Sequence, residues 1–393
     1  MDEDLRSLRK RLRTFIDTEV IPAEPLYFEQ QEETGCWNAP VLDKLRESAK
    51  AQGLWALGHP AEVGGGGVSF MDFVYLNEVI GRSELGQFAV GSASMQDCYM
   101  LHLYGTDEQK DRWLVPMARG EIFPSVGLTE PEVAGSDPTL MQSKARFDGS
   151  EIIIDAHKWF TTGANNAAFT TVFAETDPDA ESRHRRFSAI IVPTDTPGYR
   201  VVRVVPTMGH VGGGHCEIRI DAARVPAGNL LGGRGEGFVI AQRRLGPGRI
   251  FHCMRWLGQA QRAFDLMCER ASTRYAHGSL LSEKGEIQRY VAESAAEIQG
   301  HRLMTLDAAR KLDAGDDARI EISLIKFHGT QMLHNVIDRA IQVHGALGLT
   351  SDTPLDRMYR EARYGRIYDG PDEVHRMTVA RRLLRDPSLV PWA

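Results

Sequence analysis

Residues that could do chemistry concentrate between Gly127 and Asn166. Glycines in this stretch leave backbone amides open beside four hydroxyl side chains, which belong to Thr129, Ser136, Thr161 and Thr162. Trp159 and Phe160 add flat apolar faces. These groups suit a ring system edged with carbonyls and phosphates, because the faces can stack on the rings while hydroxyls and amides reach the edges. A β-rich segment with polar turns is the alternative, because small hydroxyl residues are common in turns.

Two other motifs receive no chemical role. The glycine run at residues 64–67 could cradle a phosphate, but no strand precedes it, so a flexible loop is favoured. Gly209-His210 and His215-Cys216 contain residue types that bind metals. No fourth ligand is near them in the sequence, which favours a β-turn with one buried polar side chain. The sequence therefore predicts no metal.

The elements that must position these residues change type twice along the chain. Helical spacing, as in Leu5, Leu8 and Leu12, extends to about Arg119. From about Ile122 the period becomes two, with a hairpin turn at residues 148–149 and strands at 169–175, 187–193, 199–206 and 216–220. Short strands without helices between them favour an antiparallel sheet or small barrel over a βαβ nucleotide domain.

Long helical patterns return after Gly237, and helices of that length usually pack in a bundle. We therefore expect an α+β fold with three domains: an N-terminal α-helical domain (1–121), a middle antiparallel β-barrel or sheet domain (122–235) and a C-terminal four-helix bundle (236–393).

Composition narrows the class of partner. The 393 residues carry a net charge of −7, with basic and acidic residues interspersed, so no nucleic-acid partner is expected. The five cysteines form no C-x-x-C pair, which argues against a disulfide framework. The N-terminus is acidic and no apolar run approaches a membrane span, so we expect a cytoplasmic protein without a membrane partner.

Five separate stretches resemble motifs of the acyl-CoA dehydrogenase family, in the family's order and over essentially the whole chain. Residues 129–137 are similar to its flavin and substrate loop, and residues 158–162 to its flavin-stacking strand. Further on, the similar turns are Arg274–Gly278, Gln342–Gly348 and Tyr368-Asp369-Gly370. Residues 244–249 and 369–375 resemble, more narrowly, the branch of family members ten and eleven.

The resemblance implies noncovalently bound FAD and an acyl-CoA substrate that loses an α proton and a β hydride. Asp369 matches the family's catalytic glutamate, and its backbone amide, with a flavin ribityl hydroxyl, would polarise the thioester carbonyl. Some members place the base where this chain has Gly248, which cannot take a proton. Without the resemblance, Asp369 followed by Asp372 and Glu373 is better explained as a helix start with acids in its first turn.

The resemblance also implies the other site residues. Flavin contacts from the same subunit are Thr129, Ser136, Phe160, Thr161 and Thr162. Contacts to the diphosphate and adenosine from a neighbouring subunit are Arg274, His277, Gln342, Gly345 and Ala346. Pro371 and Glu373 stand at further cofactor positions, and substrate contacts are Ser136, Arg249, Tyr368 and Gly370. The shared contacts imply a homodimer or homotetramer.

Three functions follow from these patterns. The first is an acyl-CoA dehydrogenase that passes electrons to an electron-transfer flavoprotein. The alternatives are a flavin oxidase of the same fold, similar to nitroalkane oxidase, and a catalytically silent acyl-CoA-binding protein. Three departures from the family pattern affect the site: aspartate is one methylene shorter than glutamate, His277 replaces a phenylalanine, and Pro371 with Glu373 replaces a threonine and a glutamine. The length and branching of the acyl chain are not encoded in any motif.

Overall fold

The computed structural model describes residues 2–208 and 214–389, so His210 of the Gly209-His210 motif lies outside the described residues. The chain divides into two compact units. The first contains Met1–Pro22, Ser69–Gln87 and Gly246–Ala393, and the second contains Ala23–Val68 and Phe88–Leu245.

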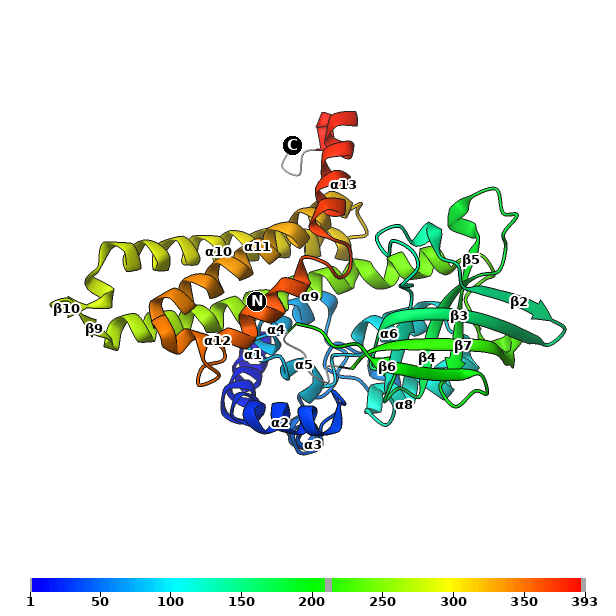
Figure 1. The fold of residues 1–393 in the computed structure, drawn as a ribbon, viewed down its shortest axis with the longest axis horizontal. Helices are drawn as coiled ribbons and strands as arrows, with labels where there is room; N and C mark the ends of the chain where they lie inside the picture. Colours follow the sequence, from blue (N-terminus) through cyan, green and yellow to red (C-terminus); the bar gives the residue numbers. More distant parts are fainter. Residues whose placement is uncertain (1, 209–213, 390–393) are drawn as a thin grey trace. The chain divides into compact units, whose positions relative to one another are not determined.

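A mixed sheet dominates the second unit (Figure 1). Its strands are β1 (Pro124–Gly127), β2 (Lys144–Asp148), β3 (Glu151–Thr162), β4 (Phe169–Glu175), β5 (Phe187–Pro193), β6 (Tyr199–Val204), β7 (His215–Pro226) and β8 (Leu230–Leu231). Their order is β6-β7-β3-β2-β4-β5-β8, with β1 on β4. The predicted antiparallel pairing is confirmed for most neighbours, but β1 and the start of β2 both pair with β4 in parallel. They share one edge of β4, at its opposite ends.

Two hydrophobic cores use the two faces of this sheet. Phe169 and Phe173 of β4 point to a core shared with the helices of this unit, including Leu101 and Met117. Val172 belongs instead to a core lined by strands β2, β3, β4, β5 and β7. Strands that are far apart in the sheet order meet in that second core, so the sheet curls around it. The helices of this unit are α2 (Glu24–Thr34), α3 (Val41–Ala51), α6 (Met95–Tyr104), α7 (Asp107–Gln109) and α8 (Val115–Arg119).

The pairing of β3 with β7 contains two irregularities of opposite sense. After Ile154 pairs with Ala223, Ala156 pairs with Ile220, so β7 has one extra residue there. After Lys158 pairs with Ile218, Thr161 pairs with Cys216, and the extra residue is now on β3. Ala222 and Phe160 lie in these two bulges, each with φ of 48°. Such bulges redirect side chains near functional sites.

The first unit is helical, as predicted for the C-terminal region. Its elements are α1 (Glu3–Phe15), α4 (Phe70–Ile80), α9 (Gly237–Thr273, which begins in the other unit), α10 (Gly285–Asp313), α11 (Arg319–His344), α12 (Leu355–Gly365) and α13 (Asp372–Arg385). A hairpin of β9 (Tyr275–Ala276) and β10 (Ser279–Leu280) joins α9 to α10. The remaining short helix, α5 (Gly86–Ala89), crosses the division between the units.

Apolar stripes hold the long helices together. Ile250, Met254 and Leu257 of α9 are buried. The buried stripe of α11 consists of Ile325, Met332, Val336, Ala340 and Val343. α4 and α9 approach so closely that a Cβ on Gly258 would lie 2.1 Å from the carbonyl oxygen of Glu78. Glycine is therefore required at that crossing.

Candidate active site

Asp369 lies in the tight turn between α12 and α13, in a strained backbone conformation. Its φ is 53°, in the left-handed region, and that of Gly370 is 102°. A non-glycine residue with such a φ costs on the order of 1–3 kcal/mol and persists where its surroundings enforce it. A Cβ on Gly370 would approach His375 Nε2 to 2.8 Å, so the turn also needs glycine there.

Side chains from three helices hold this turn by its carbonyl oxygens. The Asp369 carbonyl accepts hydrogen bonds from Arg249 Nε of α9 at 2.9 Å and His375 Nε2 of α13 at 3.2 Å. Lys326 of α11 donates to the carbonyl of Gly365 at 2.6 Å and to that of Gly370 at 3.4 Å. The backbone of the turn is thus fixed independently of the Asp369 carboxylate.

The carboxylate of Asp369 has a basic side chain beside it. His252 Nε2 of α9 lies 3.1 Å from Asp369 Oδ2. Burial, followed by the charge of Arg255, lowers the pKa of His252 to about 4, although the contact with Asp369 opposes this. Burial also lowers the pKa of Lys326 to about 8, against the charge of Asp369. A neutral imidazole and a nearby cation therefore surround the carboxylate.

Asp372, and not Asp369, is the acidic residue at the start of the helix that follows the turn. α13 begins at Asp372, and no side chain caps its first turn. Asp372 is buried and accepts hydrogen bonds from Arg366 Nε at 2.9 Å and Thr330 Oγ1 at 3.2 Å. Asp372 therefore has a structural role, and Asp369 precedes the helix in a strained turn.

Tyr368 and Arg249, both predicted substrate contacts, belong to the same cluster. Trp256 Nε1 donates to the Tyr368 hydroxyl at 3.1 Å, and burial raises the pKa of that hydroxyl. Lys326 Nζ lies 5.1 Å from the centre of the Tyr368 ring. Burial lowers the pKa of Arg249, against the charge of Asp369. The structure brings Arg249, Tyr368, Asp369 and Gly370 together, with Pro371 at the cap of α13 and Glu373 exposed in its first turn.

In the second unit, a buried ion pair anchors the loop that follows β1. Lys158 Nζ donates to Glu130 Oε1 at 2.7 Å and to the Leu128 carbonyl at 3.0 Å. Glu130 also accepts from the backbone N–H groups of Gln142 and Ser143, at 2.6 and 2.9 Å. Burial acts to raise the pKa of Glu130, but the charge and hydrogen bond of Lys158, together with the hydrogen bonds of Ser143 and Gln142, lower that pKa. The loop with Thr129 and Ser136 is therefore tied to β3.

The β3 bulge presents the predicted flavin-stacking residues. Phe160 is 43% exposed, Thr161 is buried and Thr162 is exposed. Thr162 Oγ1 lies 2.9 Å from His215 Nδ1, which gives His215 a polar partner other than a metal. Trp159 Nε1 and Thr161 Oγ1 are buried and have no hydrogen-bond partner within residues 2–208 and 214–389. An exposed aromatic face beside unpaired donors fits a flat heteroaromatic ring, so this segment fits a flavin.

The residues predicted to reach a neighbouring subunit's cofactor lie on the surface of the first unit. Arg274 directly follows α9, and His277 has φ of 49° in the β9–β10 turn. Gln342 is in the last turn of α11, and Gly345, with φ of 65°, begins the short helix Gly345–Leu349 that contains Ala346. Arg274, His277, Gln342, Gly345 and Ala346 are all exposed, as contact with another chain requires.

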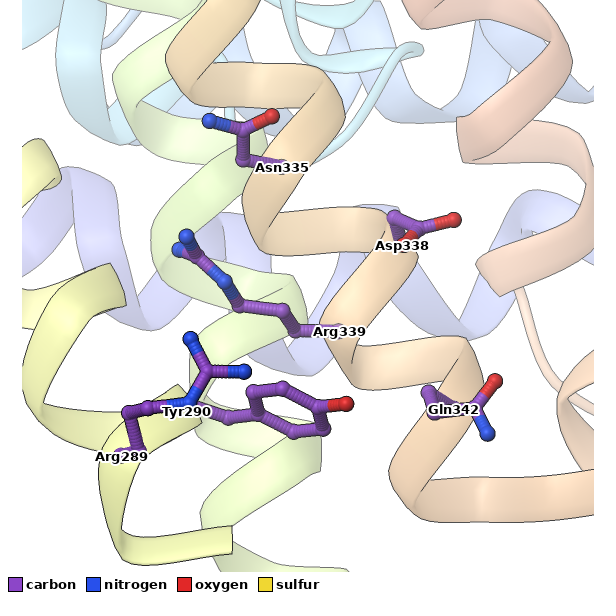
Figure 2. Close-up of a pocket in the computed structure, with 6 residues that line it drawn as sticks. All are labelled: Arg289, Tyr290, Asn335, Asp338, Arg339 and Gln342. Atoms are coloured by element: carbon purple, nitrogen blue, oxygen red, sulfur yellow. The ribbon is translucent and has the colours of Figure 1, made fainter. Parts of the chain in front are cut away.

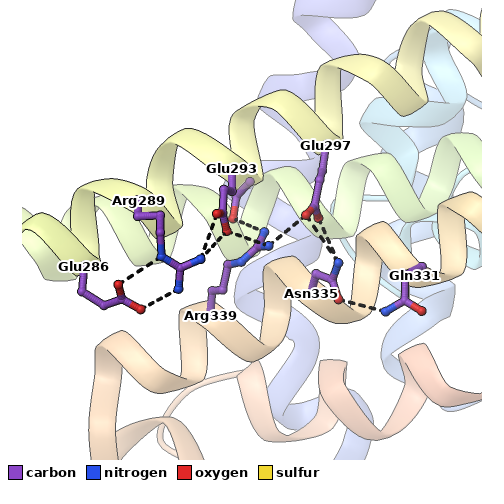
Figure 3. Close-up of polar contacts among 8 residues, drawn as sticks. Glu286, Arg289, Glu293, Glu297, Gln331, Asn335 and Arg339 are labelled. Carbon is purple, nitrogen blue, oxygen red and sulfur yellow. Dashed lines mark hydrogen bonds and ion pairs between the residues drawn. The ribbon is translucent and has the colours of Figure 1, made fainter.

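Gln342 lines an open polar cavity of about 340 Å³ between α10 and α11 (Figure 2). Two arginines also line it, Arg289 from α10 and Arg339 from α11. Glutamates of α10 pair with both: Glu293 with Arg289 at 2.8 Å, and Glu297 with Arg339 at 2.8 Å (Figure 3). The cavity therefore supplies no unbalanced positive charge for a diphosphate, which leaves Arg274 as the predicted cation for that group.

Sequence reasoning missed the side chains that support the site. His252 and Lys326 belong to no motif used above, and Glu130, Lys158 and His375 lie within motifs but received no role there. One signal was available, because His252 follows Arg249 by three residues on a helix and must share its face. Lys326 and His375 gave no such signal, since their contacts are with carbonyl oxygens distant in the sequence.

The chain belongs to the acyl-CoA dehydrogenase family. The family's N-terminal, middle and C-terminal domain models match residues 2–121, 125–223 and 235–384. Members of this family are FAD-dependent flavoproteins.

Relatives support the narrower resemblance too. Acyl-CoA dehydrogenase family member 11 of Rattus norvegicus is 40% identical over 96% of this chain, and family member 10 of Mus musculus is 40% identical over 98%. The chain spans 50% and 37% of these two proteins. The Mycobacterium tuberculosis protein described as probable acyl-CoA dehydrogenase FadE2 is 41% identical, and the match covers 95% of this chain and 93% of that one.

Solved structures share the fold. The acyl-CoA dehydrogenase of Geobacillus kaustophilus is 28% identical and superposes with a TM-score of 0.86 over 98% of both chains. Within residues 2–208 and 214–389, no helix is long and apolar enough to cross a membrane.

Proposed function

We propose that this chain dehydrogenates an acyl-CoA thioester between its α and β carbons, with Asp369 as the base that takes the α proton. The observation that carries this proposal is the strained turn of Asp369, whose carbonyl is fixed by Arg249 and His375. Strain of this kind is typical of residues with a functional role. The helix start that the sequence offered as the alternative lies at Asp372, three residues after Asp369.

In the proposed reaction, the chain's residues position and deprotonate the substrate. The Asp369 carboxylate removes the α proton, and its backbone N–H donates to the thioester carbonyl, where negative charge develops. Ser136, Arg249, Tyr368 and Gly370 contact the substrate. Bound FAD supplies the acceptor for the hydride that leaves the β carbon.

The cofactor contacts are proposed in two groups. Thr129, Ser136, Phe160, Thr161 and Thr162 hold the flavin ring and its edges within one subunit, and Pro371 and Glu373 lie at the cofactor's border. The second group reaches a neighbour's cofactor and consists of Arg274, His277, Gln342, Gly345 and Ala346. A homodimer or homotetramer follows from this sharing. We also propose the three-domain division at residues 121 and 235, a cytoplasmic location, and an electron-transfer flavoprotein as the acceptor.

The proposal is tested by anaerobic stopped-flow reduction of the FAD-loaded protein with a series of straight-chain acyl-CoA thioesters and, separately, with nitroethane. We expect an acyl-CoA thioester to bleach the flavin and nitroethane to leave it oxidised. Asp369→Asn keeps the shape of the side chain and removes the base, so reduction should slow by about 10²- to 10⁴-fold while FAD stays bound.

Three outcomes would contradict the proposal. Near wild-type reduction by Asp369→Asn would remove the base assignment. Bleaching by nitroethane alone would identify the oxidase alternative. A purified protein that stays colourless after FAD addition would favour the silent acyl-CoA-binding protein.

A further inference from the structure

His252 occupies a special place on α9, one helical turn after Arg249 and one turn before Arg255. Residues three apart on a helix lie on the same face. Arg249 binds the carbonyl oxygen of Asp369 at 2.9 Å, and His252 Nε2 lies 3.1 Å from its carboxylate oxygen Oδ2. One face of α9 therefore contacts both the backbone and the side chain of the proposed base.

The other nitrogen of His252 determines which tautomer the ring adopts. Arg255 Nη2 lies 2.7 Å from His252 Nδ1. A guanidinium can only donate hydrogen bonds, so Nδ1 must accept and the ring proton must be on Nε2. The ring proton is then on the nitrogen that lies 3.1 Å from Asp369 Oδ2, and the three side chains form a series from Arg255 through His252 to Asp369.

The imidazole in this series is neutral around pH 7. Burial, then the charge of Arg255, keeps its pKa at about 4, with a smaller contribution in the same direction from Lys326 of α11. Asp369 is the group that opposes them. A neutral donor orients a carboxylate at less cost to its basicity than an imidazolium, because charged donors stabilise the ionised form more strongly.

We propose that His252 is a positioning residue for Asp369, and that Arg255 holds His252 in the neutral Nε2–H tautomer required for this role. The inference rests on the proposed function of Asp369 as the base. The imidazole fixes the rotation of the carboxylate about its Cβ–Cγ bond and makes the two oxygens unequal, since Oδ2 faces the ring. Fixed rotation matters here because the turn holds only the backbone of Asp369.

Anaerobic flavin reduction by the acyl-CoA thioester that reduces wild type fastest tests this role. His252→Phe keeps a flat ring and removes the donor, so reduction should slow by about 10²-fold, the effect of misplacing a reacting group by about 1 Å, with the substrate Kd unchanged. His252→Gln can place an N–H donor near the original Nε2 and should restore most of the rate. His334→Phe is the matched control, because His334 packs on Tyr359 with 4.9 Å between the ring centres. The flavin of this variant should be reduced at the wild-type rate.

A second measurement reads the tautomer without catalysis. Nitrogen NMR of protein with ¹⁵N-labelled histidine should show His252 as the neutral Nε2–H form near pH 6.5, where an unperturbed histidine is half protonated. In Arg255→Met the pKa of His252 should rise, and its protonation should slow flavin reduction as the pH falls through that value. The wild type should lack this dependence.

Different experimental results would contradict the positioning role of His252 and the proposed function of Asp369. If Asp369→Asn is inactive but His252→Phe reduces at the wild-type rate, the positioning role is overturned and the base assignment stands. An Nδ1–H tautomer of His252 in the wild type would also overturn the positioning role. If Asp369→Asn itself reduces at the wild-type rate, both fail.

Discussion

Lys158 and Lys326 are both fully buried, one in each unit, yet different partners compensate their charges. Burial lowers both pKa values to about 8. Lys158 has a carboxylate partner, Glu130, at 2.7 Å. Lys326 contacts two carbonyl oxygens and the faces of Trp256 and Tyr368, and within the described residues it forms no ion pair.

This difference separates two ways of supporting a site. A carboxylate balances the charge of Lys158 locally, so the pair serves as an anchor for the loop of Thr129 and Ser136. Carbonyl oxygens and ring faces solvate Lys326 without neutralising it, so its positive charge acts on Asp369. The first arrangement stabilises the fold around the site, and the second also acts electrostatically on the proposed base.

Breaking the Glu130–Lys158 ion pair should have the largest effect on stability. Lys158→Met leaves the Glu130 carboxylate buried without its partner, and we expect the free energy of unfolding of the second unit to fall by about 3–5 kcal/mol in urea denaturation. The double variant Glu130→Gln/Lys158→Met removes both charges and should recover part of this loss. A loss below about 1 kcal/mol in the single variant would show that Glu130 does not depend on Lys158.

Removing Lys326 should lower the free energy of unfolding by less than removing Lys158. Lys326→Met leaves two carbonyl oxygens without their donor but no unpaired charge, so we expect a loss of about 1–3 kcal/mol. Flavin reduction should also slow, because the turn of Asp369 loses a support. The control is Lys10→Met, on an exposed position of α1 in the same unit. A loss larger than that of Lys158→Met would contradict the comparison.

A third effect should appear in the pH dependence of stability. The pKa of Lys326 is about 8 in the folded protein and near 10.5 when unfolded. Below about pH 8, Lys326 is protonated in both the folded and the unfolded protein, so burial of its charge destabilises the folded state fully. From about pH 8 to 10.5 the unfolded state binds more protons, so stability must rise with pH.

Urea denaturation of wild type and Lys326→Met across this range isolates the contribution, because other titrating groups cancel in the difference. The free energy of unfolding of wild type should increase relative to that of the variant as the pH rises. A difference that stays constant from pH 8 to 10.5 would mean that the pKa of Lys326 is not lowered.

The sequence predicts β4 and β5 at their observed bounds because both are mainly apolar and β-branched runs that are buried on both faces and end at polar turns. The parallel pairing of β1 with β4 has no such local signal. Strand β1 precedes β4 by more than 40 residues, and nothing in either strand specifies its neighbour. Periodicity identifies elements, whereas pairing across the sheet depends on the whole curled arrangement.

The candidate site, like the sheet, could be predicted from the sequence only in part. Glycine at position 370 next to aspartate indicates a turn, and family resemblance adds a role for the aspartate. The left-handed φ of Asp369 and the nearby His252 depend on how α9, α11 and α13 meet around the turn. Lys158 illustrates the limit, because a lysine inside a polar motif suggests exposure, and its burial becomes visible only with the loop folded over it.

The two bulges in β3 and β7 cancel one another. From Glu151 opposite Pro226 to Thr162 opposite His215, both strands advance by the same number of residues, although the register between the bulges is displaced by one. Deleting Phe160 would remove the extra residue of β3 and leave Thr161 opposite Cys216 and Thr162 opposite His215, so the pairs would persist while the local bend of the strand would be lost. The two bulges are therefore separable: loss of either extra residue would straighten its own strand and leave the pairs on both sides in register, so the bend at Phe160 does not depend on the one at Ala222.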